Sequence, residues 1–167
     1  VMFTGLVEEA GEIVRFVREE DTDRYALEVR APSVAEGVAA GDSVAVNGCC
    51  LTATAPAEEG RLRFDLLGET VRLTNFGELA PGRLVNLERS LLPTTRMGGH
   101  MVSGHIDERA VVEIFEPRGA DHYLRVQTST EALRYLVPKG SIAVDGISLT
   151  VAEVHADGFA VWLNPHT

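Results

Sequence analysis

The sequence predicts an all-β protein in which one small domain occurs twice, and two observations carry this prediction. The segment Asn47–Thr52 returns as Asp145–Thr150 after 145 − 47 = 98 residues, and Met2–Val7 returns as Met101–Ile106 with 104 − 5 = 99 residues between their glycines. Short apolar segments are separated by turn signals roughly every 8–12 residues, which is typical of a small closed barrel or a sandwich. Because solenoid repeats are much shorter than this offset, the sequence indicates a tandem duplication.

The first half shows the alternating pattern of half-buried strands. Leu27 and Val29 alternate with Glu28 and Arg30, which is the period of two expected for a strand with one buried face. The dipeptide Asn47-Gly48 is a strong tight-turn signal. The expected strands are Thr4–Val17, Tyr25–Arg30, Ser43–Val46, Cys50–Ala55, Arg61–Leu66 and Leu84–Leu91, with helical turns at Val34–Val38, capped by Ser33, and at Val71–Asn75.

The second half repeats this order but stops early. The expected strands are Ala110–Phe115, Tyr123–Thr128, Ile142–Val144, Ser148–Val154 and Phe159–Leu163, with a helical turn at Glu131–Val137. No counterpart of Val71–Leu91 follows before Thr167, so we expect an incomplete second barrel with an unpaired edge and a natural protein that continues further. The expected organisation is a first domain over residues 2–91, a linker over 92–99 and a second domain over 100–167.

Composition excludes several classes of function. Apolar residues make up 45% and charged residues 24% of the chain, as in ordinary globular proteins, and a net charge of −10 disfavours nucleic acid as a partner. No apolar run approaches the roughly 20 residues of a membrane helix, and no signal peptide is recognisable. The adjacent Cys49 and Cys50 favour a reducing compartment. We therefore expect a soluble cytoplasmic protein with a small-molecule partner.

Candidate functional residues stand at equivalent positions of the two copies. Two adjacent cysteines and five histidines show no metal-ligand spacing, and no glycine-rich phosphate loop is present. Each candidate also has an ordinary structural interpretation as a core cysteine, a strand threonine, a turn aspartate or lysine, or a surface histidine. The residues alone therefore predict a duplicated barrel that binds something small. The equivalent pairs are Cys50 with Ser148, Thr52 with Thr150, Leu6 with His105 and Asn47 with Asp145.

Several motifs in a fixed order identify a family that the chain resembles. The motifs are MFTGLV at the start, NGCCLT, FDLLGET followed by TNFGELAPG, GGHMVSGHID and DGISLTV. Together they resemble riboflavin synthase of the alpha-chain type over nearly the whole chain. The resemblance implies two six-stranded antiparallel Greek-key barrels, a C-terminal trimerising segment, a homotrimer and an association with lumazine synthase. It also implies an active site between the first barrel of one subunit and the second barrel of another.

The reaction implied by this resemblance is a dismutation, a transferase reaction that completes riboflavin biosynthesis. Two molecules of 6,7-dimethyl-8-ribityllumazine exchange a four-carbon unit to give riboflavin and 5-amino-6-ribitylamino-uracil. One molecule loses a proton from its C7 methyl group, and the anion is delocalised over the ring, so no metal or organic cofactor is expected. A histidine with an ordinary pKa of about 6.5 suits the proton transfer.

The resemblance also implies roles for individual residues. His105 is expected as the acid–base residue, Cys50 as a contact or nucleophile and Asp145 as an orienting group, while Ser148 and Thr150 contact the reacting ring. Phe3 and Ser43 belong to the supporting set, and Val1 departs from the family by preceding Met2. The first lumazine is expected against Gly5, Leu6, Val7, Cys50, Leu51, Thr52, Asp65, Leu66, Leu67, Gly68, Glu69 and Thr70. The second is expected against Gly104, His105, Ile106, Lys139, Ser148, Leu149, Thr150, Trp162, Leu163, Asn164, Pro165, His166 and Thr167.

A non-catalytic lumazine or flavin carrier of the same fold is the alternative. Such a carrier needs one good pocket, so its second copy can lose the polar residues. Both copies keep them here, and the second contains His105, Ser148 and Thr150. This pattern favours the enzyme over the carrier, and over a barrel pair that binds no ligand.

Overall fold

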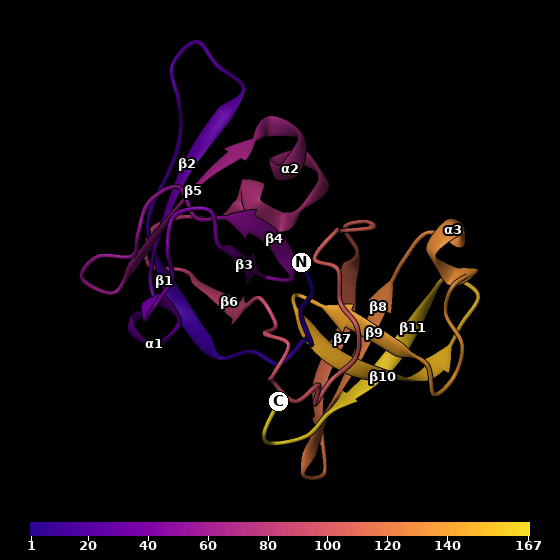
Figure 1. The fold of residues 1–167 in the computed structure, drawn as a ribbon. Coiled ribbons are helices and arrows are strands. Elements are labelled where there is room, and N and C mark those ends of the chain that lie inside the picture. The colour runs from indigo at the N-terminus through magenta and orange to yellow at the C-terminus, as the bar shows by residue number, and fades with distance from the viewer.

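The computed structural model covers residues 1–167 and shows two all-β halves side by side (Figure 1). Alternating apolar residues form the strands, as expected from the sequence. The first half contains β1 (Glu9–Arg18), β2 (Arg24–Arg30), α1 (Pro32–Ala35), β3 (Ser43–Val46), β4 (Cys49–Thr52), β5 (Arg61–Leu67), α2 (Gly68–Leu73), the 3-10 helix η1 (Asn75–Glu78) and β6 (Leu84–Arg89).

The strands of the first half form one antiparallel sheet that curls into a near-closed barrel. Their order is β4-β3-β6-β1-β2-β5, and a bridge between Ala53 and Phe64 brings the two outer strands together. Nineteen buried residues fill the interior, among them Ile13, Phe64 and Leu87. The predicted six strands and barrel are therefore confirmed for this half.

The short helices of the first half begin earlier than expected. Pro32 occupies the first turn of α1, and Ala31 rather than Ser33 stands at the N-cap position. Proline suits this position because its fixed φ is helical and its missing N–H is not needed. The N–H groups of Ser33 and Val34 bind the Glu9 carboxylate instead, each at 2.9 Å. The expected Ser33 cap was therefore wrong, because a carboxylate distant in the sequence satisfies these donors.

The second half is a five-stranded antiparallel sheet without a counterpart of β6. Its order is β7-β8-β11-β10-β9, so β7 and β9 are the outer strands on either side of the place that β6 fills in the first half. Its buried cluster has only six residues, and Val112 and Phe115 of β7 remain exposed. The expected unpaired edge is confirmed. The elements are β7 (Val111–Arg118), β8 (Asp121–Gln127), α3 (Thr130–Leu133), β9 (Ser141–Val144), β10 (Ile147–Val154) and β11 (Gly158–Leu163).

Local backbone geometry repeats between the halves. Asn47 and Gly48 have φ values of 45° and 79°, and Asp145 and Gly146 have 47° and 81°. Positive φ at both central residues is the signature of a type I′ hairpin, whose twist matches that of the flanking strands. The register of β1 with β2 shifts between Ile13 and Arg15. The register of β7 with β8 shifts between Val112 and Ile114, which are the equivalent residues of the second half. The two halves are thus copies in backbone detail as well as in sequence.

Candidate functional site

The N-terminal segment and its repeat meet between the two halves. Phe3 and Val102 form an antiparallel bridge, with N···O distances of 2.8 and 3.1 Å. The Phe3 side chain is completely buried. Figure 1 shows the N-terminus at the boundary of the halves, next to the orange-yellow strands of the second one. Phe3 and Val102 are equivalent residues of the two copies, so the halves are related by an approximate twofold axis that passes between these two segments.

Each of these segments also contacts a strand of the other half, the first segment β10 and the second segment β4. The Ser148 N–H donates to the carbonyl of Gly5 at 2.7 Å, and the Cys50 N–H donates to the carbonyl of Gly104 at 2.8 Å. A Cβ on Gly5 would lie 2.8 Å from the Ser148 Cβ, and one on Gly104 would lie 2.6 Å from the Cys50 Cβ. Both glycines have positive φ, which L side chains avoid. The loops are therefore exchanged between the halves, whereas the sequence grouped Gly5 with Cys50 and Gly104 with Ser148.

A buried carboxylate fixes the first of these loops. Glu88, on β6, accepts hydrogen bonds from the Thr4 N–H at 2.6 Å, the Thr4 hydroxyl at 2.7 Å and the Gly5 N–H at 2.9 Å. The side chains of both Glu88 and Thr4 are buried, and a buried carboxylate needs such donors. Sequence reasoning missed this network because Thr4 and Glu88 are 84 residues apart.

The two tight turns touch on the same axis. A Cβ on Gly48 would lie 2.7 Å from the Gly146 N, and a Cβ on Gly146 would lie 2.7 Å from the Gly48 N. Asn86 joins the turns, since its N–H donates to the Asn47 side chain at 2.8 Å and its amide donates to the Asp145 carbonyl at 3.0 Å. Burial raises the pKa of Asp145 above its ordinary value. Asp145 therefore lies where the halves join, at the end of the hairpin that carries Ser148.

On the second-half side, Ser148 has an imidazole partner that sequence reasoning missed. The His100 Nδ1 lies 2.7 Å from the Ser148 hydroxyl oxygen, and both side chains are half-buried. Burial lowers the pKa of His100 below its ordinary value. The only sequence signal was the preceding Gly98-Gly99 pair, which admits close backbone approach. Thr150, two residues along β10, is exposed, and Leu149 between them is buried.

On the first-half side, Cys50 is partly accessible and its neighbour Cys49 is not. Burial raises the pKa of the Cys49 thiol to about 11. Leu51 is buried and Thr52, paired with Ser43, is exposed. The exchanged loop brings its own residues here. Ile106 packs against the core of the first half, and the exposed side chain of His105 makes no hydrogen bond.

The remaining expected residues lie at the ends of equivalent strands. Asp65–Thr70 spans the end of β5 and the start of α2, where Asp65, Leu67 and Glu69 are exposed and Leu66 and Gly68 are buried. In the second half, Leu163 packs against the core, and Asn164–Thr167, including Pro165 and His166, forms an exposed turn.

Trp162 lies on the outer face of the second sheet. Its ring packs edge-on against Tyr123 with 5.2 Å between the ring centroids, and the Arg118 guanidinium lies 3.9 Å above the Tyr123 ring. Leu163, the next residue, points inward to the core. The Trp162 side chain thus belongs to an outer aromatic cluster, on the face of the sheet opposite to the core.

Lys139 has a backbone conformation unusual for its type. Its φ is 68°, and its counterpart in the first half, 98 residues earlier, is Gly41 with φ 91°. The N–H groups make equivalent bonds, from Gly41 to the Ala53 carbonyl at 2.9 Å and from Lys139 to the Val151 carbonyl at 2.7 Å. A non-glycine residue in this region costs about 1–2 kcal/mol. The exposed turn residues Asp21 and Glu59 have positive φ as well, so the backbone of Lys139 reflects its turn.

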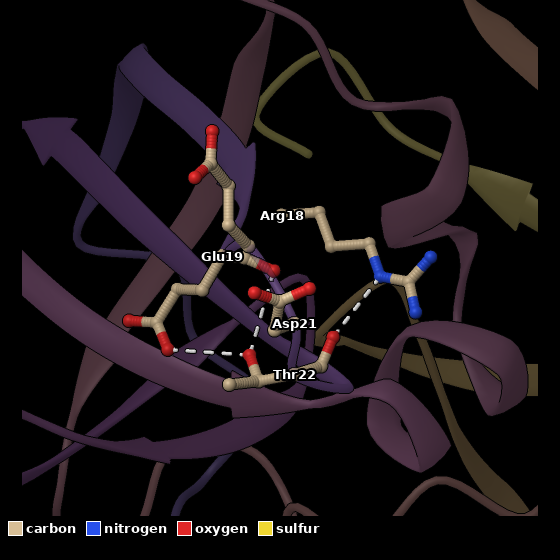
Figure 2. A pocket seen from close by; sticks show the side chains of 5 residues that line it. Arg18, Glu19, Asp21 and Thr22 are labelled. Atoms are coloured by element: carbon tan, nitrogen blue, oxygen red, sulfur yellow. Dashed lines mark hydrogen bonds between the residues drawn. The ribbon is translucent and has the colours of Figure 1, made fainter.

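Two hollows differ in what they could bind. One of about 500 Å³ lies at the β1–β2 turn and is lined by Arg18, Glu19, Glu20, Asp21 and Thr22. In Figure 2 the Arg18 Nε donates to the Thr22 carbonyl, and the Thr22 hydroxyl donates to Glu19. It has no apolar wall on which a heterocycle could stack.

The second hollow, of about 250 Å³, is mainly apolar. It is lined by Asn86, Val112, Phe115, Leu124, Val144, Asp145, Ile147, Leu149 and Leu163.

Comparison with known proteins agrees with the duplication and with the motifs. The lumazine binding domain matches the chain twice, over residues 4–90 and 103–167. Riboflavin synthase of Mycobacterium bovis is 44% identical over 171 residues, which span 99% of this chain and 83% of the relative. Riboflavin synthases of Bacillus subtilis and Schizosaccharomyces pombe are 39% and 40% identical, with 76% and 79% of their lengths covered.

Solved structures share the fold. LumP complexed with 6,7-dimethyl-8-(1'-D-ribityl) lumazine matches with a TM-score of 0.84 at 24% identity, covering 97% of this chain and 86% of that one. LumP complexed with riboflavin matches with a TM-score of 0.87 at 23% identity, covering 96% of this chain and 86% of that one. None of the helices found here has the length and apolar character needed to span a bilayer. From the repeated domain and the similarity to its curated relatives, the chain belongs to the riboflavin synthase family of lumazine-binding proteins.

Proposed function

We propose that the protein catalyses the dismutation of two molecules of 6,7-dimethyl-8-ribityllumazine to riboflavin and 5-amino-6-ribitylamino-uracil. Relatives named riboflavin synthase, 39–44% identical over nearly the whole chain, support this proposal. The observation that carries it is the reciprocal contact of Gly5 with Ser148 and of Gly104 with Cys50. Two identical substrates require two similar binding places, and a matched pair of loop–strand contacts supports such an arrangement.

The two places differ in chemistry, which suits the unequal roles of the two substrates. One combines Ser148, Leu149 and Thr150 with the Gly5 loop, and the other combines Cys50, Leu51 and Thr52 with the Gly104 loop. Strand ends at 65–70 and 162–167 complete them in the proposed arrangement. We assign Ser148 and Thr150 as polar contacts, Cys50 as a contact or nucleophile and His105 as an acid–base group. Holding the substrates in register can supply about 7–11 kcal/mol of the barrier reduction.

We further propose that the reaction uses no metal or organic cofactor and takes place in the cytoplasm. The unpaired Cys49 and Cys50 support a reducing compartment. A homotrimer and an association with lumazine synthase follow from the family resemblance alone. In a trimer, the first barrel of one subunit would face the second barrel of another. Sedimentation of the purified protein, alone and mixed with lumazine synthase, tests both assemblies.

The competing function is a non-catalytic carrier, which the similarity of fold to LumP supports. Incubation with 6,7-dimethyl-8-ribityllumazine separates the two functions. The enzyme forms riboflavin and the uracil product in equal amounts, whereas a carrier binds the lumazine and forms neither.

A His105 variant tests the assigned acid–base role. His105→Ala should lower turnover far more than it weakens lumazine binding, and His155→Ala, in the β10–β11 turn, is the control. Equal losses of turnover and binding would show that His105 is only a contact.

A further inference from the structure

The turn at Asn47 and Gly48 has the dipeptide sequence in which an asparagine side chain reacts most readily with its own backbone. Glycine has no side chain to hinder its nitrogen, so the Gly48 N can attack the Asn47 Cγ and close a cyclic imide. The equivalent turn of the second half contains Asp145 and Gly146, where an acid already stands in place of the amide. The first residues of the two turns therefore differ by one reaction, the deamidation of asparagine.

The reacting groups of this turn are free of hydrogen bonds that would block the reaction. The Gly48 N–H donates to no acceptor, and neither does the side-chain nitrogen of Asn47, which would leave as ammonia. The side-chain oxygen of Asn47 accepts the Asn86 N–H at 2.8 Å. A donor at this oxygen makes Cγ more electrophilic and stabilises the oxyanion that forms when the nitrogen attacks. The groups that deamidation needs are therefore all present in the turn.

Packing between the halves keeps these groups from reacting. Gly48 is buried, and its nitrogen would lie only 2.7 Å from a Cβ on Gly146. The Asn47 N–H is bonded to the Asn86 carbonyl at 2.8 Å, and positive φ values hold both turn residues in a type I′ conformation. Closing the imide requires the peptide plane between Asn47 and Gly48 to rotate, and a plane packed against Gly146 has no room to do so. The imide can therefore close only when the two turns separate.

We propose that Asn47 is a modification site whose deamidation is controlled by the contact between the two halves. In the first step the bond from the Gly48 N to the Asn47 Cγ forms and the Cγ–Nδ2 bond breaks. The Gly48 proton leaves with the amide nitrogen as ammonia. Water then adds to either carbonyl of the imide and opens it, which gives aspartate or isoaspartate. Nothing is oxidised or reduced, and water is the only co-reactant.

The two products should affect the turn differently. Aspartate leaves the main chain unchanged, and Asp145 shows that an acid fits this turn, since its φ of 47° is close to the 45° of Asn47. Isoaspartate lengthens the main chain, and the close contact of Gly48 with Gly146 does not accommodate a longer turn. Isoaspartate should therefore prevent the halves from closing again, so that an opening which leads to it leaves a permanent change in the chain.

Peptide mass spectrometry of protein aged in mildly alkaline buffer measures the rate of deamidation at Asn47. The native wild-type protein should react about 100-fold more slowly than the same chain unfolded in urea, because only the open fraction reacts. Gly146→Ala adds a Cβ to the contact and should raise the native rate about tenfold. Gly82→Ala, which has open space around it, is the matched control and should keep a native rate close to that of the wild type.

A second variant opens the contact without adding a clash. Asn86→Ala removes the amide that donates to the Asp145 carbonyl at 3.0 Å but keeps the N–H that binds Asn47. It should raise the native rate about fivefold, which corresponds to the loss of one hydrogen bond. In urea all the variants should react at one rate. Equal rates for native and unfolded wild-type protein, or native rates in both Gly146→Ala and Asn86→Ala no higher than in Gly82→Ala, would overturn the proposal.

Urea unfolding of the two products tests the permanent change. The isoaspartate form, isolated from aged protein, should unfold at a lower urea concentration than Asn47→Asp, because only its main chain is altered. An isoaspartate form as stable as Asn47→Asp would overturn this part of the proposal. None of these measurements uses a substrate, so their results do not depend on the reaction that the protein catalyses.

Discussion

Gly48 and Gly146 lie back to back, so that a Cβ on either residue would be 2.7 Å from the backbone nitrogen of the other. Both are the second central residue of a tight turn and both have positive φ. The contact places the hairpins that carry Cys50 and Ser148 next to each other. The relative position of the two candidate binding places therefore depends on two glycines that belong to neither.

Alanine at these glycines should separate the halves. Gly48→Ala or Gly146→Ala adds the cost of positive φ to a backbone clash, and should lower the free energy of unfolding by about 3 kcal/mol. Gly82→Ala is the matched control, since Gly82 has φ of 85° and open space around it. It should lose only about 1 kcal/mol. Urea unfolding measures all three, and equal losses would show that the Gly48–Gly146 contact contributes nothing.

Glu88→Gln should loosen the Gly5 loop. The amide replaces a carboxylate that accepts three hydrogen bonds and points an NH₂ group at donors. We expect a loss of about 2–3 kcal/mol in unfolding free energy and weaker lumazine binding. Glu78→Gln removes an exposed pair with Arg109 and should lose about 0–1 kcal/mol. A Glu88 variant as stable as the Glu78 variant would contradict the anchoring role.

The stability of the protein should depend on pH through His100. Its folded-state pKa is lowered by burial, so below the ordinary value of about 6.5 the unfolded chain binds the proton more readily. This contribution to stability is fully present above pH 6.5 and is lost as the pH falls toward the folded-state pKa. His100→Asn should remove that part of the decline in urea midpoints. An identical pH profile in the variant would show that His100 titrates as in the unfolded chain.

The two adjacent cysteines should react very differently with a thiol reagent. A pKa of about 11 leaves the Cys49 thiol about one part in a thousand ionised at pH 8, and Cys49 is buried. We expect one fast-reacting thiol per native chain, lost in Cys50→Ser and kept in Cys49→Ser. Bound lumazine should protect it. Two thiols reacting at one rate would contradict the difference in accessibility.

Much of the fold could be predicted because its signals are local. Alternation identified the strands, Asn47-Gly48 identified a turn, and the absent counterpart of Val71–Leu91 identified the unpaired edge of the second sheet. The α1 cap was missed because its acceptor is Glu9, a residue 24 positions away from Ser33.

The candidate site was predicted only as a set of residues. The repeat shows that Gly5 is equivalent to Gly104 and Cys50 to Ser148, but equivalence does not say which loop contacts which strand. The exchange depends on packing between the halves, which no local pattern encodes. His100 was missed because its counterpart, Val1, lies outside the repeated segment Met2–Val7, so the comparison of copies did not include it.

The exchange of loops between the halves can be tested most directly by lumazine binding to two glycine variants, with the Cys50 thiol as reporter. The wild-type protein should bind two lumazine molecules per chain. Gly104→Ala should lose the molecule that protects Cys50, because its Cβ would lie 2.6 Å from that of Cys50. Gly5→Ala should lose the other molecule and keep Cys50 protected. Loss of Cys50 protection in Gly5→Ala, with protection retained in Gly104→Ala, would contradict the exchange.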